Sequence, residues 1–505
     1  MLRACVLCCD LVTLQGAVFM NGKITGIFSV LLALCVILAA ATADPWYQLL
    51  QSQFLNLDNV MNLLSRLALY GILGIGVAFV IISSGIDLSI GSLVCLCGVM
   101  LAMLLKVDYQ PEQPLLVERI EAAAQTITVS GDAAAVSPGT VVRYTGGIGS
   151  GLVLTVESVE GNQIRVREPL KRDERDGRIV LASAVSSMEA DGLSLQLPLL
   201  GSAAVGDQLQ LFLPDGAVTT QKITAVKSDS TSTALSLARD PGAKYRGGAF
   251  AVLLKRNQRT SIPVAVMLVL VMAGGLGLVH GLLITRLHLQ PFVVTLCGLL
   301  IYRGVSRWLT NDNPAGFGEL QQVLGPLASG RVGLVYNGED MVFGIPIPFF
   351  LLLLIAGLAA AFLNRTIWGR YLLALGRNEE AARFSGINTG KITVLAYILC
   401  ALLAAVGGML FAIEFSSISP SSFGNSFELY AIAAAVLGGC SLRGGEGSII
   451  GVVIGTAVMQ VLNNLIVLLK IPQSLEATII GAVILLGVLG DELMRRAAAR
   501  RRLRG

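Results

Sequence analysis

Asp87 places a carboxylate between two long apolar runs, within residues 84–92, which read SGIDLSIGS. A charge at membrane depth is costly and normally faces a cavity, a partner or an interface. The glycines and serines around it permit close helix approach or a local break in a helix. Two interpretations follow. Either Asp87, Ser89 and Gly91 shape a polar pathway, or Asp87 caps a helix that begins at Leu88.

A second charged stretch, residues 376–387 (GRNEEAARFSGI), has the pattern of a short amphipathic helix that ends at Gly386. A charged helix between two membrane spans is either a solvated connector or a rigid peg that fits a cytoplasmic partner. Periodicity alone favours the solvated connector.

Small residues dominate a third stretch, residues 427–448, so that backbones there can pack closely or turn sharply between short helices. Glu428 lies near its start. We expect this carboxylate near the outer membrane interface, where a charge costs less than at mid-membrane.

The chain offers no arrangement typical of an enzyme. It has two histidines, His280 and His288, with no Ser/His/Asp arrangement. The run 386–391 lacks one spacer residue of a phosphate-binding loop, and Ile392 replaces the Ser or Thr that would bind Mg²⁺. We therefore expect no catalytic residue, no cofactor, no metal site and no ATP hydrolysis by this chain itself. His280 is interpreted as either a pathway or a packing residue.

The elements that must position these residues are membrane helices. Apolar residues make up 54% of the chain and charged residues 14%, and the mean hydropathy is +0.73. An ordinary soluble domain has about 25% charged residues. This composition excludes a soluble enzyme, a nucleic-acid binder and a disordered scaffold. It predicts an α-helical polytopic protein of the inner (plasma) membrane, in contact with the lipid bilayer.

Ten apolar segments are expected to cross the bilayer, each needing about 20 residues. They are 25–43, 62–83, 87–106, 262–285, 291–310, 346–364, 392–414, 427–440, 448–469 and 474–490; the segment 427–440 is short enough to be broken or re-entrant. An even number places both termini on one side. The basic loop 365–391 and the basic tail after residue 494 assign that side to the cytoplasm by the positive-inside rule.

Residues 107–260 do not fit a membrane span. Short alternating runs broken by Gly, Asp and Pro predict β-strands there. The segment also matches itself at an offset of about 67 residues, which predicts two tandem small β-barrels or sandwiches. The expected organisation is therefore an N-terminal transmembrane region (residues 1–106), an inserted extracytoplasmic β-rich domain (residues 107–260), and a C-terminal transmembrane region (residues 261–505) that contains the cytoplasmic loop 365–391.

Together, these stretches resemble the sugar-type permeases of ATP-binding-cassette importers, the ribose, galactose and autoinducer group. Residues 84–92 resemble the family pattern GGIDLSVGS and differ at Ser84 and Ile90. Residues 291–296 (PFVVTL) with Arg303-Gly304 resemble its PFxxTL…RG element. Residues 376–387 resemble its coupling loop GGNEEAARLSGI, and 427–448 its ELDAIAA…GG run. His280 stands where Asn is usual, Tyr430 where Asp is common, and the insertion has no usual counterpart.

The resemblance implies a pathway for a monosaccharide such as ribose, enclosed by two permease chains that are identical or closely related. A separate cytoplasmic ATPase would dock on 376–387, and an external sugar-binding protein would deliver the solute. The residues implied for the ATPase contact are Gly376, Asn378, Glu379, Glu380, Arg383 and Gly386. The residues implied for the pathway are Asp87, Ser89, Gly91, His280, Phe292, Thr295 and Glu428. Two alternatives stay open: a related permease for a nucleoside or a branched-chain amino acid, and a receptor or envelope-binding protein on a permease scaffold.

Overall fold

The computed structural model describes residues 24–43, 52–337 and 340–483, with Leu485 and Leu489, apart from gaps between 112 and 249. Those gaps are 112–113, 131–132, 134–135, 146–151, 171–172, 174–176, 186, 189–193, 199–202, 213–217, 229–231 and 239–249. The basic tail and the end of the expected span 474–490 lie outside the described residues.

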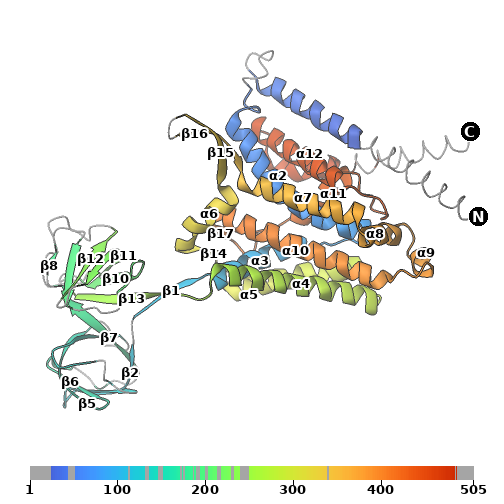
Figure 1. The fold of residues 1–505 in the computed structure, drawn as a ribbon. Coiled ribbons are helices and arrows are strands. Elements are labelled where there is room, and N and C mark those ends of the chain that lie inside the picture. The colour runs from blue at the N-terminus through green and yellow to red at the C-terminus, as the bar shows by residue number, and fades with distance from the viewer. Residues whose placement is uncertain are drawn as a thin grey trace, which may run out of the picture. The chain divides into compact units, whose positions relative to one another are not determined.

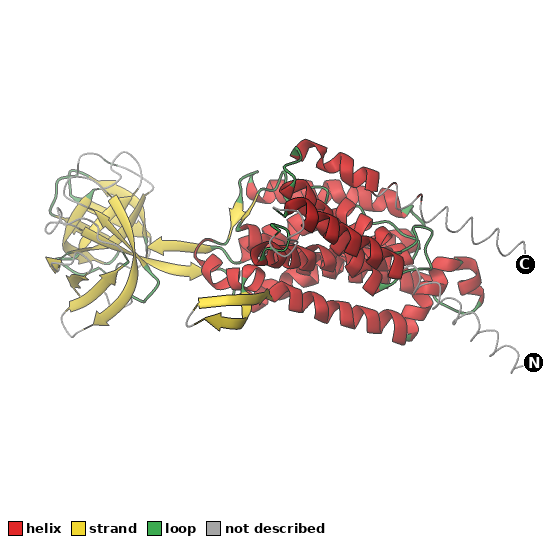
Figure 2. Ribbon diagram, turned by 90° about the horizontal axis from the view of Figure 1, so that it is seen from above, coloured by secondary structure: helices red, strands yellow, loops and turns green. Residues whose placement is uncertain are grey.

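Internal contacts divide the chain into two compact units, Met1–Lys106 with Thr260–Gly505, and Val107–Arg259. We call them the helical unit and the strand unit. In the described residues, the first consists mainly of helices and the second of strands (Figures 1 and 2).

The helical unit contains, within its described residues, seven helices that are long and apolar enough to cross a membrane. They are Ile24–Thr42, α2 (Leu57–Ile82), α4 (Ile262–Arg286), α5 (Pro291–Thr310), α7 (Ile347–Arg365), α10 (Thr389–Phe415) and α12 (Ile449–Leu468). Two further expected spans form shorter apolar helices, α3 (Ile90–Leu104) and α11 (Phe427–Leu437). The predicted helical membrane-type architecture with a β-rich segment is thereby confirmed.

Shorter elements occupy the two ends of the helical unit. At one end lie α8 (Ile367–Arg377) and α9 (Glu379–Phe384), and at the other lie α6 (Gln321–Ser329) and the hairpin of β15 (Arg331–Asn337) and β16 (Asp340–Pro346) (Figure 1). The remaining short elements are β14 (Ala315–Gly316), which pairs with β17 (Ser417–Ile418), and two 3-10 turns at Gly318–Leu320 and Gln473–Leu475.

Helix α2 forms the centre of the helical unit. All its residues from Leu67 to Ile82 are buried except Tyr70. Glycines let three neighbouring helices approach its backbone closely. A Cβ at Gly71 would lie 2.9 Å from Leu352 of α7, and one at Gly76 would lie 3.2 Å from the Cys400 carbonyl of α10. α12 approaches it in the same way at Gly74.

Large apolar side chains on α4, α5 and α7 are exposed, as expected for helices that face lipid or another apolar surface. The most exposed of them are Met267, Val271, Leu300, Ile301, Trp308, Leu354 and Leu358.

The strand unit is one antiparallel sheet system with two similar halves. Its strands are β1 (Val107–Pro111), β2 (Leu115–Glu121), β3 (Thr126–Ser130), β4 (Val141–Thr145), β5 (Val153–Glu160), β6 (Gln163–Val166), β7 (Gly177–Ala184), β8 (Ser187–Met188), β9 (Ser194–Pro198), β10 (Gln208–Phe212), β11 (Val218–Ser228), β12 (Ser232–Leu237) and β13 (Phe250–Gln258). The order β2-β3-β6-β5-β4-β7 in the first half corresponds to β8-β9-β12-β11-β10-β13 in the second.

Corresponding residues of the two halves have the same local structure. Gly139 and Gly206, 67 residues apart, have φ angles of 88° and 98°. Their amides donate to the carbonyls of Val156 and Ile223, which are also 67 residues apart. Positive φ favours glycine because it has no Cβ. Each half has its own apolar core, one centred on β3–β6 and the other on β10–β13. In the first half, β2 also pairs with β7, which closes that half into a barrel.

Candidate functional site

The loop between α2 and α3 holds Asp87 in a buried position, with 2% of its surface exposed. Its Oδ1 accepts hydrogen bonds from the Ser89 amide at 2.9 Å and the Ser89 hydroxyl at 2.7 Å. The helix begins at Ile90, two residues later than the predicted start at Leu88, and Ser89 is its N-terminal flanking residue. The carboxylate therefore organises the local backbone.

His280 and Thr295 lie beside this loop. The Thr295 hydroxyl donates to the Ile86 carbonyl at 3.3 Å, and the Tyr302 hydroxyl is 2.8 Å from His280 Nε2. A Cβ at Gly298 would fall 2.7 Å from His280 Nε2 and 3.2 Å from Ser89 Cβ. The structure thus brings Asp87, Ser89, His280 and Thr295 together in a buried, tightly packed cluster, where α3, α4 and α5 meet.

Two other residues selected from the sequence lie elsewhere. Glu428, at the start of α11, reaches Gly91 of α3 so closely that a Cβ at Gly91 would overlap its carboxylate. Phe292, at the start of α5, has 51% of its surface exposed and is not a member of the buried cluster.

The selected residues of the coupling loop have separate structural roles. Asn378 caps α9, because its Oδ1 accepts from the Ala381 amide at 2.9 Å. Gly386 has a φ of 81°, and the Ile387 amide donates to the Ala382 carbonyl, so the chain leaves α9 through a glycine C-cap. Glu379, Glu380 and Arg383 are exposed, so α9 presents charge to its surroundings.

A cluster of hydrogen bonds that mostly involve backbone atoms attaches this loop to α2. The Ser84 hydroxyl lies 3.1 Å from the Gly376 carbonyl and 3.0 Å from the Arg443 carbonyl, and the Gly445 amide donates to the Ile82 carbonyl at 2.9 Å. A Cβ at Gly376 would overlap the Ile82 carbonyl oxygen. The three stretches selected from the sequence therefore meet at one point. We call these residues (Ile82, Ser84, Gly376, Arg443, Gly445) the junction.

Phe384 is a residue that sequence reasoning missed. It is the last residue of α9 and 85% of its surface is exposed. An exposed aromatic side chain beside charged residues is typical of a protein contact. The available signal was one large apolar residue within the charged run 377–385.

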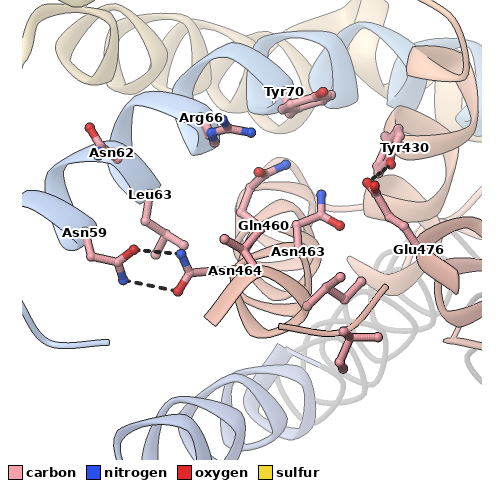
Figure 3. Close-up of a pocket in the computed structure, with 13 residues that line it drawn as sticks. Asn59, Asn62, Leu63, Arg66, Tyr70, Tyr430, Gln460, Asn463, Asn464 and Glu476 are labelled. Atoms are coloured by element: carbon pink, nitrogen blue, oxygen red, sulfur yellow. Dashed lines mark hydrogen bonds between the residues drawn. The ribbon is translucent and has the colours of Figure 1, made fainter. Parts of the chain in front are cut away.

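A polar cavity of about 520 Å³ was also missed; it lies between α2, α11 and α12 (Figure 3). Its polar lining consists of Asn59, Asn62, Arg66, Tyr70, Tyr430, Gln460, Asn463, Asn464 and Glu476. Asn59 and Asn464 exchange two side-chain hydrogen bonds of 3.1 and 2.7 Å, and the Tyr430 hydroxyl donates to Glu476 at 2.5 Å.

Spacing in the sequence could have revealed this cavity. Asn59, Asn62 and Arg66 recur at intervals of three and four residues, as do Gln460 and Asn464, so each set shares one face of an otherwise apolar helix. Polar side chains within membrane spans are costly and mark functional sites by default.

Comparisons with known proteins identify the family. Residues 242–488 match the family described as branched-chain amino acid transport system / permease component. The ribose import permease protein RbsC of Escherichia coli strain K12 is 38% identical over 230 residues, which are 45% of this chain and 68% of that protein. The autoinducer 2 import system permease protein LsrC of Escherichia coli O9:H4 is 34% identical over 261 residues, 50% of this chain and 71% of that protein.

A third relative, RbsC of Bacillus subtilis, is 37% identical over 213 residues, covering 42% of this chain and 62% of that protein. No solved structure matches the chain. The chain belongs to the sugar-type permease family of ATP-binding-cassette importers, and the resemblance inferred from its motifs is confirmed.

Proposed function

We propose that this permease passes a monosaccharide inward, with ribose as the first candidate, by alternating access driven by a separate cytoplasmic ATPase. The observation that carries the proposal is the junction, in which Gly376, two residues before the Asn378 cap of the exposed helix α9, bonds the Ser84 hydroxyl at the end of the central helix α2. A ligand shifts a conformational equilibrium only through its different affinity for the two states. ATP binding by a partner docked on α9 would reach α2 through this attachment.

The test is uptake of labelled ribose by cells that carry the permease with its native partners. Deletion of the chain should abolish uptake, and re-expression should restore it. Replacement of Glu379 and Glu380 by Lys should prevent an ATPase from co-purifying while the chain stays in the membrane. Restored uptake of leucine or a nucleoside, with none of ribose, would instead support a related solute class.

The branched-chain amino-acid alternative has one observation in its favour beyond the description of the matched family. Arg66 and Glu476 both line the polar cavity, and together they offer partners for a carboxylate and an ammonium group. The same uptake assay with leucine as the solute decides between the two classes.

The proposed assembly contains two permease chains, and the exposed apolar side chains of α4, α5 and α7 would face lipid or the second chain. In the proposed topology of ten spans, both termini are cytoplasmic and the strand unit is extracytoplasmic. A Cys at the exposed position Lys227 tests this arrangement, because an impermeant maleimide should label it in intact cells above the level of the unsubstituted chain. Labelling only after lysis would reverse the topology.

We also propose that the strand unit, as an inserted extracytoplasmic domain, guides or replaces the external sugar-binding protein. Its two similar halves support a role in recognition. Deleting residues 110–258 and rejoining the spans should lower uptake or weaken capture of the binding protein. If uptake and capture both stay unchanged, the insertion is a tolerated loop insertion with no role in transport.

A further inference from the structure

We infer that the polar cavity between α2, α11 and α12 binds a small neutral polyhydroxylated solute of the sugar class within a single chain. This inference rests on the proposed function and assigns a solute site to it. The cavity volume of about 520 Å³ lies within the range of small-molecule sites, about 300–1,000 Å³. It is separate from the buried Asp87 cluster, with which it shares none of its lining residues.

Two polar atoms in its wall lack hydrogen-bond partners among the described residues. Gln460 is 98% buried, yet its Nε2 has no partner, and Oδ1 of the partly buried Asn463 has none either. Figure 3 shows both side chains at the cavity between α12 and α2. Buried polar groups are nearly always paired, because desolvation without a partner is costly. A ligand or water must therefore supply one acceptor and one donor here.

A hydroxyl group meets this requirement, because it both donates and accepts. Rotating both amides by 180° leaves the requirement unchanged, whereas rotating only one changes it to two donors or two acceptors. A carboxylate only accepts and an ammonium group only donates, so an amino acid satisfies both orphan atoms in only one orientation of the two amides and with both of its charged groups placed there. Adjacent hydroxyls on a sugar ring satisfy both kinds, whichever way the amides lie.

The rest of the lining favours a neutral solute with an apolar face. Arg66 and Glu476 contribute one charge of each sign, and Glu476 already accepts from Tyr430. Leu63, Ile466, Val467 and Ile471 complete the wall with apolar surface, against which the C–H groups of a sugar ring can pack. The Asn59–Asn464 pair joins α2 to α12 along one side of the cavity.

The test is saturation-transfer-difference NMR on the full chain in lipid nanodiscs, with D-ribose as probe and leucine as the comparison. D-ribose should bind, and its affinity should fall about tenfold in Gln460→Leu and in Asn463→Leu, which corresponds to loss of one hydrogen bond. Thr456→Val is the matched control, because Thr456 is buried one turn earlier on α12 and its hydroxyl already bonds the Val452 carbonyl at 2.8 Å.

A folding defect is separated from a binding defect by the sign of the stability change. Replacing an orphan buried amide by an apolar group of similar size removes a desolvation cost, so Gln460→Leu should unfold at a higher temperature than the parent chain. Higher stability together with weaker ribose binding supports the inference. A lower unfolding temperature, or an equal one, would contradict the orphan assignment.

The site inference and the proposed function can fail separately. If cells take up ribose through this permease but Gln460→Leu and Asn463→Leu bind it like the parent chain, the function stands and the cavity site is wrong. If leucine binds in a Gln460-dependent manner and ribose does not, the inferred chemical class is wrong. If only ordered water occupies the cavity, neither probe gives a signal at any concentration, which also overturns the inference.

Discussion

The hydroxyl of Ser84 lies 3.1 Å from the carbonyl oxygen of Gly376, 292 residues further along the chain. Ser84 ends the turn that follows α2, and Gly376 is the penultimate residue of α8. The contact joins the helix that lines the polar cavity to the loop that carries α9. Movement of the loop must therefore displace the end of α2 or break this junction.

Ser84 has a φ of 65°, in the left-handed region where a side chain is strained. Ser84→Gly should relieve about 1 kcal/mol of strain while losing hydroxyl hydrogen bonds of similar worth, so the unfolding temperature should change little. Ser84→Ala keeps the strain and loses the bonds, so it should be about 1 kcal/mol less stable than Ser84→Gly. Thermal unfolding in detergent measures this difference, and equal stability of the two variants would refute the argument.

Gly376→Ala should damage the junction more severely. The added Cβ would overlap the Ile82 carbonyl oxygen and the Gly445 amide nitrogen, both backbone atoms that cannot move aside alone. We expect a loss of about 1–3 kcal/mol and weaker capture of the ATPase. Gly357→Ala in α7 is the control, because no atom lies within 4 Å of its added Cβ. Similar behaviour of the two variants would count against the junction.

Phe384→Ala should leave the chain's stability within about 0.5 kcal/mol of the parent, because the ring is 85% exposed. It should weaken ATPase capture about 30-fold if Phe384 anchors the contact, which corresponds to about 2 kcal/mol. Co-purification at graded salt and detergent measures the loss. Trp308→Ala, with 75% exposure at the end of α5, should leave capture unchanged. Undiminished capture by Phe384→Ala would remove the residue from the interface.

His280→Leu should destabilise the helical unit by about 1–3 kcal/mol, because it leaves the buried Tyr302 hydroxyl without its partner at 2.8 Å. The double variant with Tyr302→Phe should recover some of that loss, since both polar groups are then absent. Thermal unfolding of the parent chain, the two single variants and the double variant gives the interaction energy between the two side chains. Strict additivity would mean that the hydrogen bond contributes nothing.

Glu168 makes the strand unit sensitive to acid. Burial alone would raise its pKa, but hydrogen bonds from the Thr155 amide at 2.5 Å and hydroxyl at 2.7 Å outweigh burial and hold the pKa below its ordinary value. A carboxyl whose pKa is lower in the folded state stabilises it at neutral pH, and this contribution is lost as pH falls below about 4.3. Glu168→Gln should speed hydrogen exchange of the Thr155 amide a few-fold at pH 7. The difference should shrink as pH falls through the lowered pKa of this carboxyl; a difference that does not change with pH would point to packing instead.

The sequence was sufficient to predict elements with a strong periodic signal. The segment 291–310 was predicted with the bounds that α5 has; α4 differs by one residue at one end, and α7 and α12 differ by one residue at each end. Apolar length alone sets these spans. The third span was predicted from residue 87, and the capping interpretation of Asp87 began its helix at Leu88; α3 begins at Ile90, because Asp87 bonds the Ser89 amide within the preceding loop. Helix α6 was not predicted, since its nine residues are too few and too polar to give a membrane signal.

Contacts between distant segments were harder to predict than the elements. Gly376 was selected, and residues 84 and 445 lie in the two other stretches that were noted, but the partners that they bond are main-chain atoms, which leave no trace in residue type. The cavity had a signal in the three-to-four spacing of Asn59, Asn62 and Arg66. The spacing marks a polar face on one helix but does not show which helix packs against it, so the cavity itself was overlooked.

The junction also constrains how such permeases can be recombined. Because the Ser84 hydroxyl and the Ile82 carbonyl bond main-chain atoms of two other segments, a cytoplasmic loop transplanted from a relative would fit only if residues 82–84 and 443–445 came with it. The three segments must therefore be exchanged together, although they are far apart in the sequence; we call them the block. A chimera that receives all three segments of the block from one relative should bind the ATPase of that relative. A chimera that receives only some of them should assemble poorly, whichever solute it transports.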